Sequence, residues 1–132
     1  MIVVDASVLA NALGDDTADG EAARRRLDRD RSLHAPHLID LEVLSVLRRW
    51  SARGSLDERR AGFALADLAD LPITRYPHQP LAPRIWELRH SLTPYDAAYV
   101  ALAEALGCTL VTGDARMEKA AGTACSIEVL GP

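Results

Sequence analysis

Four acidic residues interrupt or end apolar runs, and this placement limits how the chain can fold. They are Asp5, Glu42, Asp96 and Asp114. Their apolar segments, which contain no Lys or Arg, cover residues 2–5, 38–44, 95–102 and 109–114. A carboxylate that is partly removed from water is costly unless a cation lies beside it. The fold must therefore bring a cation to these side chains from elsewhere, and a divalent metal ion could serve all four.

Short apolar strands alternate with helices along the chain. Runs typical of buried strands cover residues 2–4, 73–76, 109–112 and 126–130. Helices are predicted over residues 8–13, 17–30, 37–53, 57–70, 85–92, 94–106 and 116–121, separated by Gly, Pro and capping residues. This alternation predicts an α/β fold with a central, mainly parallel sheet of four or five strands and helices on both faces. We expect one domain over residues 1–132.

The charge balance argues against binding nucleic acid through overall charge. The net charge is −4, but with the four acids set aside the remaining acidic residues equal the 15 basic ones in number. All the basic residues except Lys119 are Arg, clustered over residues 24–31, 48–53 and 59–60. Arg clusters suit bidentate contacts with phosphate, and they are also common on solvated helix faces. Both interpretations stay open.

The sequence also predicts where the protein resides. No stretch is apolar over the roughly 18 residues that a membrane helix needs. The first residues lack the basic region of a signal peptide, and Asp5 comes too early for one. We expect a soluble cytoplasmic protein that makes no contact with a membrane, in which Cys108 and Cys125 are reduced thiols.

The four acids can meet at one edge of the predicted sheet. Asp5 and Asp114 follow predicted parallel strands, and Asp96 begins the helix that leads into the second of these strands. Ligands bind at the carboxyl edge of open α/β sheets. Glu42 lies on an apolar stripe of its helix, so solubility does not explain it. Taken singly, each of the three Asp residues could instead cap a helix or a turn.

Convergence of these acids would require a cation. Two carboxylates about 4 Å apart repel by roughly 4 kcal/mol at an effective dielectric constant near 20. Oxygen ligands favour hard ions, so we expect Mg²⁺, for which Mn²⁺ can substitute. Such an ion suits phosphodiester hydrolysis, because it lowers the pKa of bound water and stabilises charge on the phosphate.

At these residues the chain resembles the PIN-domain ribonucleases, above all the small VapC-type toxins of bacterial toxin–antitoxin pairs. The matching segments are Val4-Asp5-Ala6-Ser7-Val8-Leu9, Glu42-Val43-Leu44-Ser45-Val46-Leu47-Arg48-Arg49, Thr93-Pro94-Tyr95-Asp96-Ala97-Ala98-Tyr99-Val100-Ala101-Leu102-Ala103 and Leu110-Val111-Thr112-Gly113-Asp114. Their order and spacing fit across essentially the whole chain. The resemblance implies a PIN-like three-layer sandwich and a Mg²⁺- or Mn²⁺-dependent endoribonuclease toxin.

The resemblance also implies roles for particular residues. The expected direct metal ligands are Asp5 and Asp96, with Asp114 binding directly or through water. Glu42 would orient the attacking water or hold a second ion. Ser7 would lie beside the metal, and Thr112 would support Asp114.

The expected reaction is hydrolysis of structured RNA to a 5′-phosphate and a 3′-hydroxyl, with tRNA and ribosomal RNA equally open. The expected partners are a VapB-type antitoxin, whose tail plugs the acidic pocket, and a second copy in a homodimer. Many relatives carry another acid shortly after the position of Asp114. Here Ala115-Arg116-Met117 follows and Glu118 comes one position late, which leaves a second metal in doubt. Arg48 and Arg116 are candidate contacts to RNA phosphate.

Three other functions compete with this one. Haloacid-dehalogenase-like phosphatases and receiver domains also place an Asp after the first strand, but they use a Lys near the phosphoryl group, and Lys119 follows the last acid too closely. An inactive RNA- or partner-binding module and a DNA nuclease of the same fold are the other two. We expect the remaining aromatic residues to pack in the core or at a subunit contact, namely Trp50, Phe63, Trp86 and Tyr99.

Overall fold

The computed structural model describes residues 1–131, in which five strands form one sheet in the order β3-β2-β1-β4-β5. Every neighbouring pair is parallel. The strands are β1 (Ile2–Val4), β2 (Leu33–Pro36), β3 (Ile73–Tyr76), β4 (Thr109–Thr112) and β5 (Ile127–Val129). The prediction of a central parallel sheet is confirmed. Pro132, the last residue of the expected single domain, lies outside the described residues.

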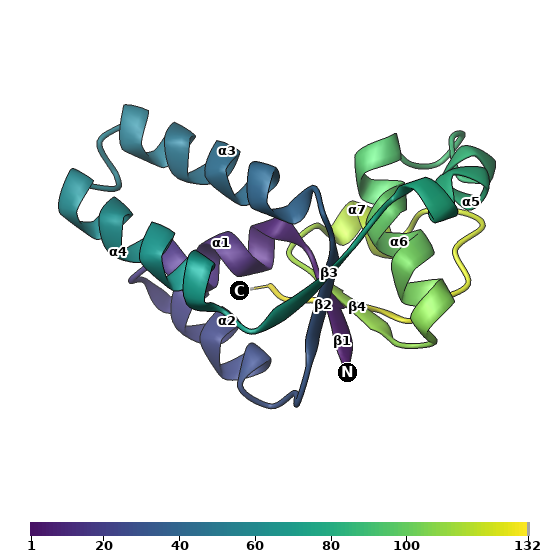
Figure 1. The fold of residues 1–132 in the computed structure, drawn as a ribbon, viewed down its shortest axis with the longest axis horizontal. Coiled ribbons are helices and arrows are strands. Elements are labelled where there is room, and N and C mark those ends of the chain that lie inside the picture. Colours follow the sequence, from purple (N-terminus) through teal and green to yellow (C-terminus); the bar gives the residue numbers. More distant parts are fainter. Residues whose placement is uncertain (132) are drawn as a thin grey trace.

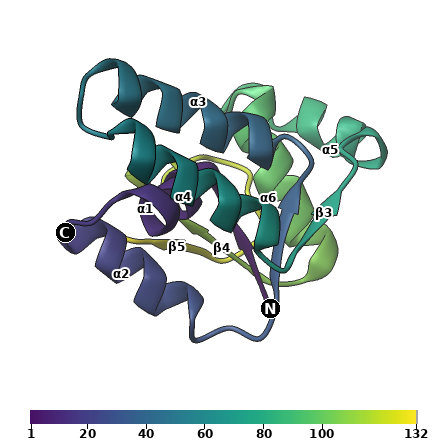
Figure 2. The ribbon, with the colours of Figure 1, turned by 60° about the vertical axis from the view of Figure 1, so that its left-hand side comes forward.

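Helices cover both faces of this sheet. They are α1 (Ala6–Gly14), α2 (Ala18–Leu27), α3 (Ile39–Ala52), α4 (Glu58–Asp70), α5 (Ala82–Glu87), α6 (Pro94–Leu106) and α7 (Ala115–Glu118), with a 3₁₀ turn at Gln79–Leu81. Helices α1 to α4 lie on one side of the strands, and α5 and α6 lie on the other (Figure 1). Figure 2 shows α3 and α4 as a pair beside α1. The three-layer α/β sandwich is therefore confirmed. Within residues 1–131, no helix has the length and apolarity to cross a bilayer.

Strand β2 is the one strand of this sheet that the sequence does not predict. It is only four residues long, contains a histidine and ends in a proline, which cannot donate to a strand ladder. It is nevertheless buried along its whole length. His34 tolerates burial because its Nδ1 lies 2.7 Å from the hydroxyl of Tyr76 and its Nε2 lies 2.9 Å from Ser32 Oγ.

Several predicted boundaries and packing roles need correction. Helices α2, α5 and α7 end at Leu27, Glu87 and Glu118, earlier than predicted. Among the aromatic residues, Tyr99 is buried as expected. The core prediction is wrong for Phe63 and Trp86, which are 55% and 67% exposed, and a subunit contact stays a prediction for both.

Helix α6 and strand β1 form the rigid centre that carries the site. All three residues of β1 are buried, and so is an unbroken run of α6 from Ala97 to Ala103. Thr93 caps α6, because its side chain accepts a hydrogen bond from the Asp96 N–H at 3.2 Å. Gly107 ends the helix in the left-handed conformation, with φ of 65°. The first turn of α6 is thus anchored beside the end of β1.

Candidate active site

All four predicted acids line one cavity. Its volume is about 240 Å³, and it opens beyond the carboxyl ends of β1 and β4. Strand β2 lies next to β1 toward one edge of the sheet, and β4 lies next to β1 toward the other edge. The strand order therefore reverses between β1 and β4, and α/β proteins bind ligands at such a switch point. The lining residues are Asp5, Ala6, Ser7, Glu42, Ser45, Val46, Arg49, Asp96, Tyr99, Asp114 and Met117.

Asp5 caps a helix and faces the cavity at the same time. It is 7% exposed, and its Oδ1 accepts hydrogen bonds from Ser7 Oγ at 2.7 Å and from the Val8 N–H at 3.1 Å. Its Oδ2 accepts a hydrogen bond from Thr112 Oγ1. Burial raises the pKa of Asp5, although these hydrogen bonds oppose the shift. Asp5 therefore caps α1 and lines the cavity at the same time, so the two interpretations of this residue do not exclude each other.

Ser7 and Thr112 connect the ends of β1 and β4 through Asp5. The Gly113 N–H donates to Ser7 Oγ at 3.1 Å, and the Asp114 N–H donates to Thr112 Oγ1 at 3.0 Å. A Cβ at Gly113 would lie 3.0 Å from Ser7 Oγ, a contact tighter than usual, so Gly113 leaves room for the Ser7 hydroxyl. Thr112 was expected to support Asp114, and its Oγ1 accepts the hydrogen bond from the Asp114 N–H while it donates to Asp5.

Glu42 is held by a residue whose contribution the sequence did not reveal. The Tyr99 hydroxyl donates to Glu42 Oε1 at 2.6 Å. Burial raises the pKa of Glu42, helped by the charges of Asp96 and Asp5 and opposed by the Tyr99 hydrogen bond. Burial, followed by the bond to Glu42, raises the pKa of Tyr99, so the phenol stays a donor. Tyr99 follows Asp96 by three residues, a spacing that places both on one helix face.

Asp96 completes a group of three acids that form no ion pair in the described part of the chain. Burial first, and then the negative charge of Asp114, raises the pKa of Asp96. Within residues 1–131, neither Asp96 nor Asp5 nor Glu42 forms an ion pair. Carboxylates that are desolvated and close to one another favour binding of a cation.

Asp114 differs from the other three because it is already paired. Arg116 Nη2 lies 2.8 Å from its Oδ2, and Arg116 Nε lies 3.1 Å from its Oδ1. The Arg116 guanidinium holds the pKa of Asp114 below its usual range. Arg116, 88% exposed at its side chain, was predicted to contact RNA phosphate, and it contacts Asp114 here. The phosphate contact stays a prediction.

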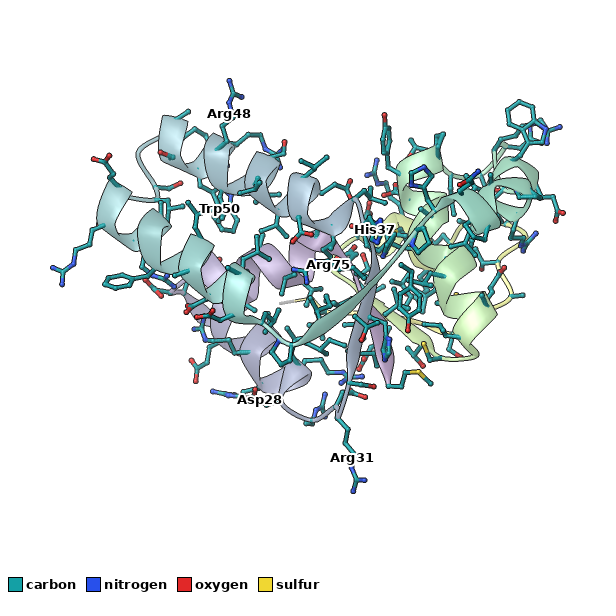
Figure 3. All side chains as sticks on the ribbon, viewed as in Figure 1. Asp28, Arg31, His37, Arg48, Trp50 and Arg75 are labelled. Carbon is teal, nitrogen blue, oxygen red and sulfur yellow. The ribbon has the colours of Figure 1, made fainter. Side chains whose placement is uncertain are left out.

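The arginines of α3 point in different directions. Arg48, one of the two predicted RNA contacts, projects from α3 into solvent away from the sheet (Figure 3), and its contact with RNA stays a prediction. Its neighbour Arg49 lines the cavity with Glu42. Arg49 follows Glu42 by seven residues, which places these two side chains two helical turns apart on nearly the same face of α3. This spacing was the signal that could have distinguished Arg49 from Arg48.

The donor set suits a hard divalent ion, although the four acids do not close around one point. Within residues 1–131, no three Asp, Glu, His or Cys side chains are placed to bind one metal ion together. Mg²⁺ is usually held by one or two carboxylates and several waters, so it needs no such cage. Asp5 and Asp96 fit this mode, and Asp114 could join them once released from Arg116.

Comparison with known proteins defines the class. The family model described as PIN domain matches residues 2–123. The chain belongs to the PIN-domain family, and within it to the VapC-type toxins. It is 48% identical to VapC ribonuclease Mb0985 of Mycobacterium bovis, with 98% of each chain covered. It is 43% identical to ribonuclease VapC1 of Mycobacterium tuberculosis, with 97% of this chain and 96% of the relative covered. These relationships support a nuclease enzyme.

Solved structures agree on the fold. The chain superimposes on VapC20 of Mycobacterium tuberculosis, described as a sarcin–ricin loop cleaving toxin, with a TM-score of 0.68 and 19% identity over 94% of this chain and 97% of that one. It also matches VapBC2 of Rickettsia felis, solved with a promoter DNA fragment, with a TM-score of 0.66 and 14% identity over 99% and 100% of the two chains. At these identities the likeness establishes a common fold.

Proposed function

We propose that this protein is a Mg²⁺- or Mn²⁺-dependent endoribonuclease toxin of VapC type. One observation carries the proposal. Asp5, Glu42 and Asp96 line one cavity at the switch point of a parallel sheet and form no ion pair among the described residues. Relatives named as ribonucleases, 48% identical over nearly the whole chain, support this choice.

The side chains of this protein would prepare the site for hydrolysis. We assign Asp5 and Asp96 as direct metal ligands and Asp114 as a ligand that binds directly or through water. When bound, the ion supplies a water of lowered pKa and stabilises charge on the phosphate. Ser7 and Thr112 hold both carboxylate oxygens of Asp5 in place.

Glu42 has the surroundings of a group that orients the attacking water. Tyr99 occupies its Oε1, and its Oε2 has no hydrogen-bond partner within residues 1–131. Its raised pKa makes Glu42 a better proton acceptor near neutral pH. Attack of water on the phosphodiester would leave a 5′-phosphate and a 3′-hydroxyl.

The substrate class and the partners follow from the family. We propose structured RNA as the substrate, with tRNA and ribosomal RNA both open, and a cytoplasmic location where such RNA is found. A VapB-type antitoxin and a homodimer are the proposed protein contacts. Exposed apolar side chains are available for them on α3, α4, α5 and α6, namely Leu41, Phe63, Trp86 and Tyr95.

The decisive experiment is a cleavage assay with purified protein on tRNA, ribosomal RNA and DNA. RNA cleavage should require Mg²⁺ or Mn²⁺, stop with EDTA and be lost in Asp96→Asn. Asp67→Asn, which changes an exposed acid of α4, is the matched control and should retain activity. Cleavage that persists with EDTA would contradict the proposal. Preference for DNA would indicate a DNA nuclease, and absence of all cleavage would indicate a binding module.

A further inference from the structure

Arg49 is a cation in the wall of an acidic cavity, and nothing in the described chain pairs with it. It lies on the face of α3 that also brings Glu42, Ser45 and Val46 to the cavity. Among the lining residues within 1–131 it is the one basic residue. Its guanidinium forms no hydrogen bond or ion pair in this part of the chain, whereas Arg116 is bound to Asp114. A free guanidinium beside a reactive centre is available for an anionic ligand.

We propose that Arg49 binds a phosphate of the RNA strand next to the one that is cut. This inference rests on the proposed ribonuclease function and names a positioning residue for it. A bare cluster of carboxylates repels a polyanion, so the enzyme needs an attractive contact within the cavity. The planar guanidinium provides one, since its parallel N–H groups match two phosphate oxygens.

The geometry of α3 assigns Arg49 to a neighbouring phosphate and not to the reacting one. Arg49 follows Glu42 by seven residues, which corresponds to about 10 Å along the helix axis. Glu42 lies in the first turn of α3, and Arg49 lies in its last turn, although both line the cavity. The RNA strand would therefore pass along α3 on leaving the catalytic acids.

The other arginines of this helix do not face the same cavity. Arg48 projects into solvent on the outer side of α3 (Figure 3). Arg53 lines a different cavity together with Asp57 and Arg60. Arg53→Ala is therefore a matched control for Arg49→Ala, because it removes the same charge from an exposed residue four positions later, at the end of the same helix.

The test is steady-state cleavage of a short RNA at several salt concentrations. We expect Arg49→Ala to raise KM by about 10- to 100-fold, the range for a lost hydrogen bond to a charged group. The slope of log(kcat/KM) against log salt should become shallower by about 1 unit. The kcat should change little, Arg49→Lys should be intermediate, and Arg53→Ala should match the wild type. Melting temperatures check that each variant is folded.

A scan of the RNA with single neutral methylphosphonates locates the contact. One position beside the cut should weaken wild-type binding and have no further effect in Arg49→Ala. Unchanged KM and salt slope in Arg49→Ala would overturn the inference while leaving the ribonuclease function intact. A loss confined to kcat would also overturn it, because Arg49 would then act on the reacting phosphate. A wild type that cuts no RNA with Mg²⁺ would overturn both proposals.

Discussion

Helix α6 carries two carboxylates near its opposite ends, and their surroundings are opposite too. Glu104 is clamped by Arg84, with Nε–Oε1 at 2.7 Å and Nη2–Oε2 at 3.0 Å, and it accepts the Ala124 N–H at 2.7 Å. These contacts lower the pKa of Glu104. Asp96, in the first turn, has no ion pair among residues 1–131, and burial raises its pKa. One acid is neutralised by the fold, and the other is left for a ligand.

The difference separates structural acids from functional ones. Arg84 also donates to the Gly122 carbonyl at 2.6 Å, so the Glu104 cluster ties α5 and α6 to the segment before β5. Its removal should weaken the fold. Asp96 is repelled by the other acids of the cavity, so its removal should spare the fold and destroy the function. Stability and activity should therefore respond in opposite ways at the two ends of α6.

The largest expected effect is on catalysis in Asp96→Asn. We expect cleavage to fall by about 1,000-fold or more, because a lost metal ligand removes several kcal/mol of transition-state stabilisation. The amide keeps the shape and relieves repulsion from Asp114, so the melting temperature in EDTA should stay the same or rise. Single-turnover cleavage and thermal melts measure the two effects. A variant that loses activity only because it has unfolded would break the comparison.

The second expected effect is stabilisation by metal. An ion at 100 times its Kd adds about 2.7 kcal/mol to the free energy of unfolding, which raises Tm by roughly 5 to 10 °C. Mn²⁺ should therefore stabilise the wild type and Glu104→Gln alike, and Asp5→Asn much less. If wild type and Asp5→Asn melt alike with Mn²⁺ and with EDTA, the proposed metal site is wrong.

The third effect concerns stability in Glu104→Gln. Loss of the charged partner of Arg84 should cost about 2 kcal/mol, and cleavage per folded molecule should be unchanged. Glu87→Gln is the control, because Glu87 meets the same Arg84 at 3.0 Å from an exposed position and should matter little. Denaturant melts measure the difference. Equal costs in the two variants would show that the Glu104 clamp has no special role.

This third effect should also depend on pH. Folding lowers the pKa of Glu104 from its ordinary value of 4.5. Its contribution to stability is therefore present above that value and is lost as the pH falls through the folded pKa. The gap between wild type and Glu104→Gln should close in acid. A gap that stays constant down to low pH would show that the charge of Glu104 is not what stabilises the fold.

The positions of the acids could be predicted because their signals are local. Asp5 and Asp114 follow apolar strands directly, and the parallel order of the sheet then brings them together. Asp96 lies beside a recognisable cap, and Glu42 lies on an apolar helix stripe. Each signal spans a few residues of sequence, so tertiary structure was not needed to recognise it.

The missed features depend on contacts between distant parts of the chain. Strand β2 holds a buried histidine whose partner, Tyr76, lies 42 residues away. The Tyr99 hydroxyl reaches Glu42 across 57 residues. Neither pairing leaves a local trace, because a buried polar group is acceptable wherever the fold provides a partner. The ion pair of Arg116 with Asp114 spans only two residues, yet the sequence pattern indicated a phosphate contact for Arg116 in its place.

The smallest expected effect concerns Arg116, which makes Asp114 resemble Glu104 more than Asp96. The pair competes with metal for the Asp114 carboxylate, but Arg116 is exposed and such pairs are weak. Arg116→Ala should therefore tighten Mn²⁺ binding only about two- to fivefold, and Arg116→Lys should have less effect. Isothermal titration calorimetry measures the change. Unchanged RNA affinity of Arg116→Ala at low salt would remove the predicted phosphate contact, and weaker Mn²⁺ binding would show that Arg116 supports Asp114 as a ligand instead of competing for it.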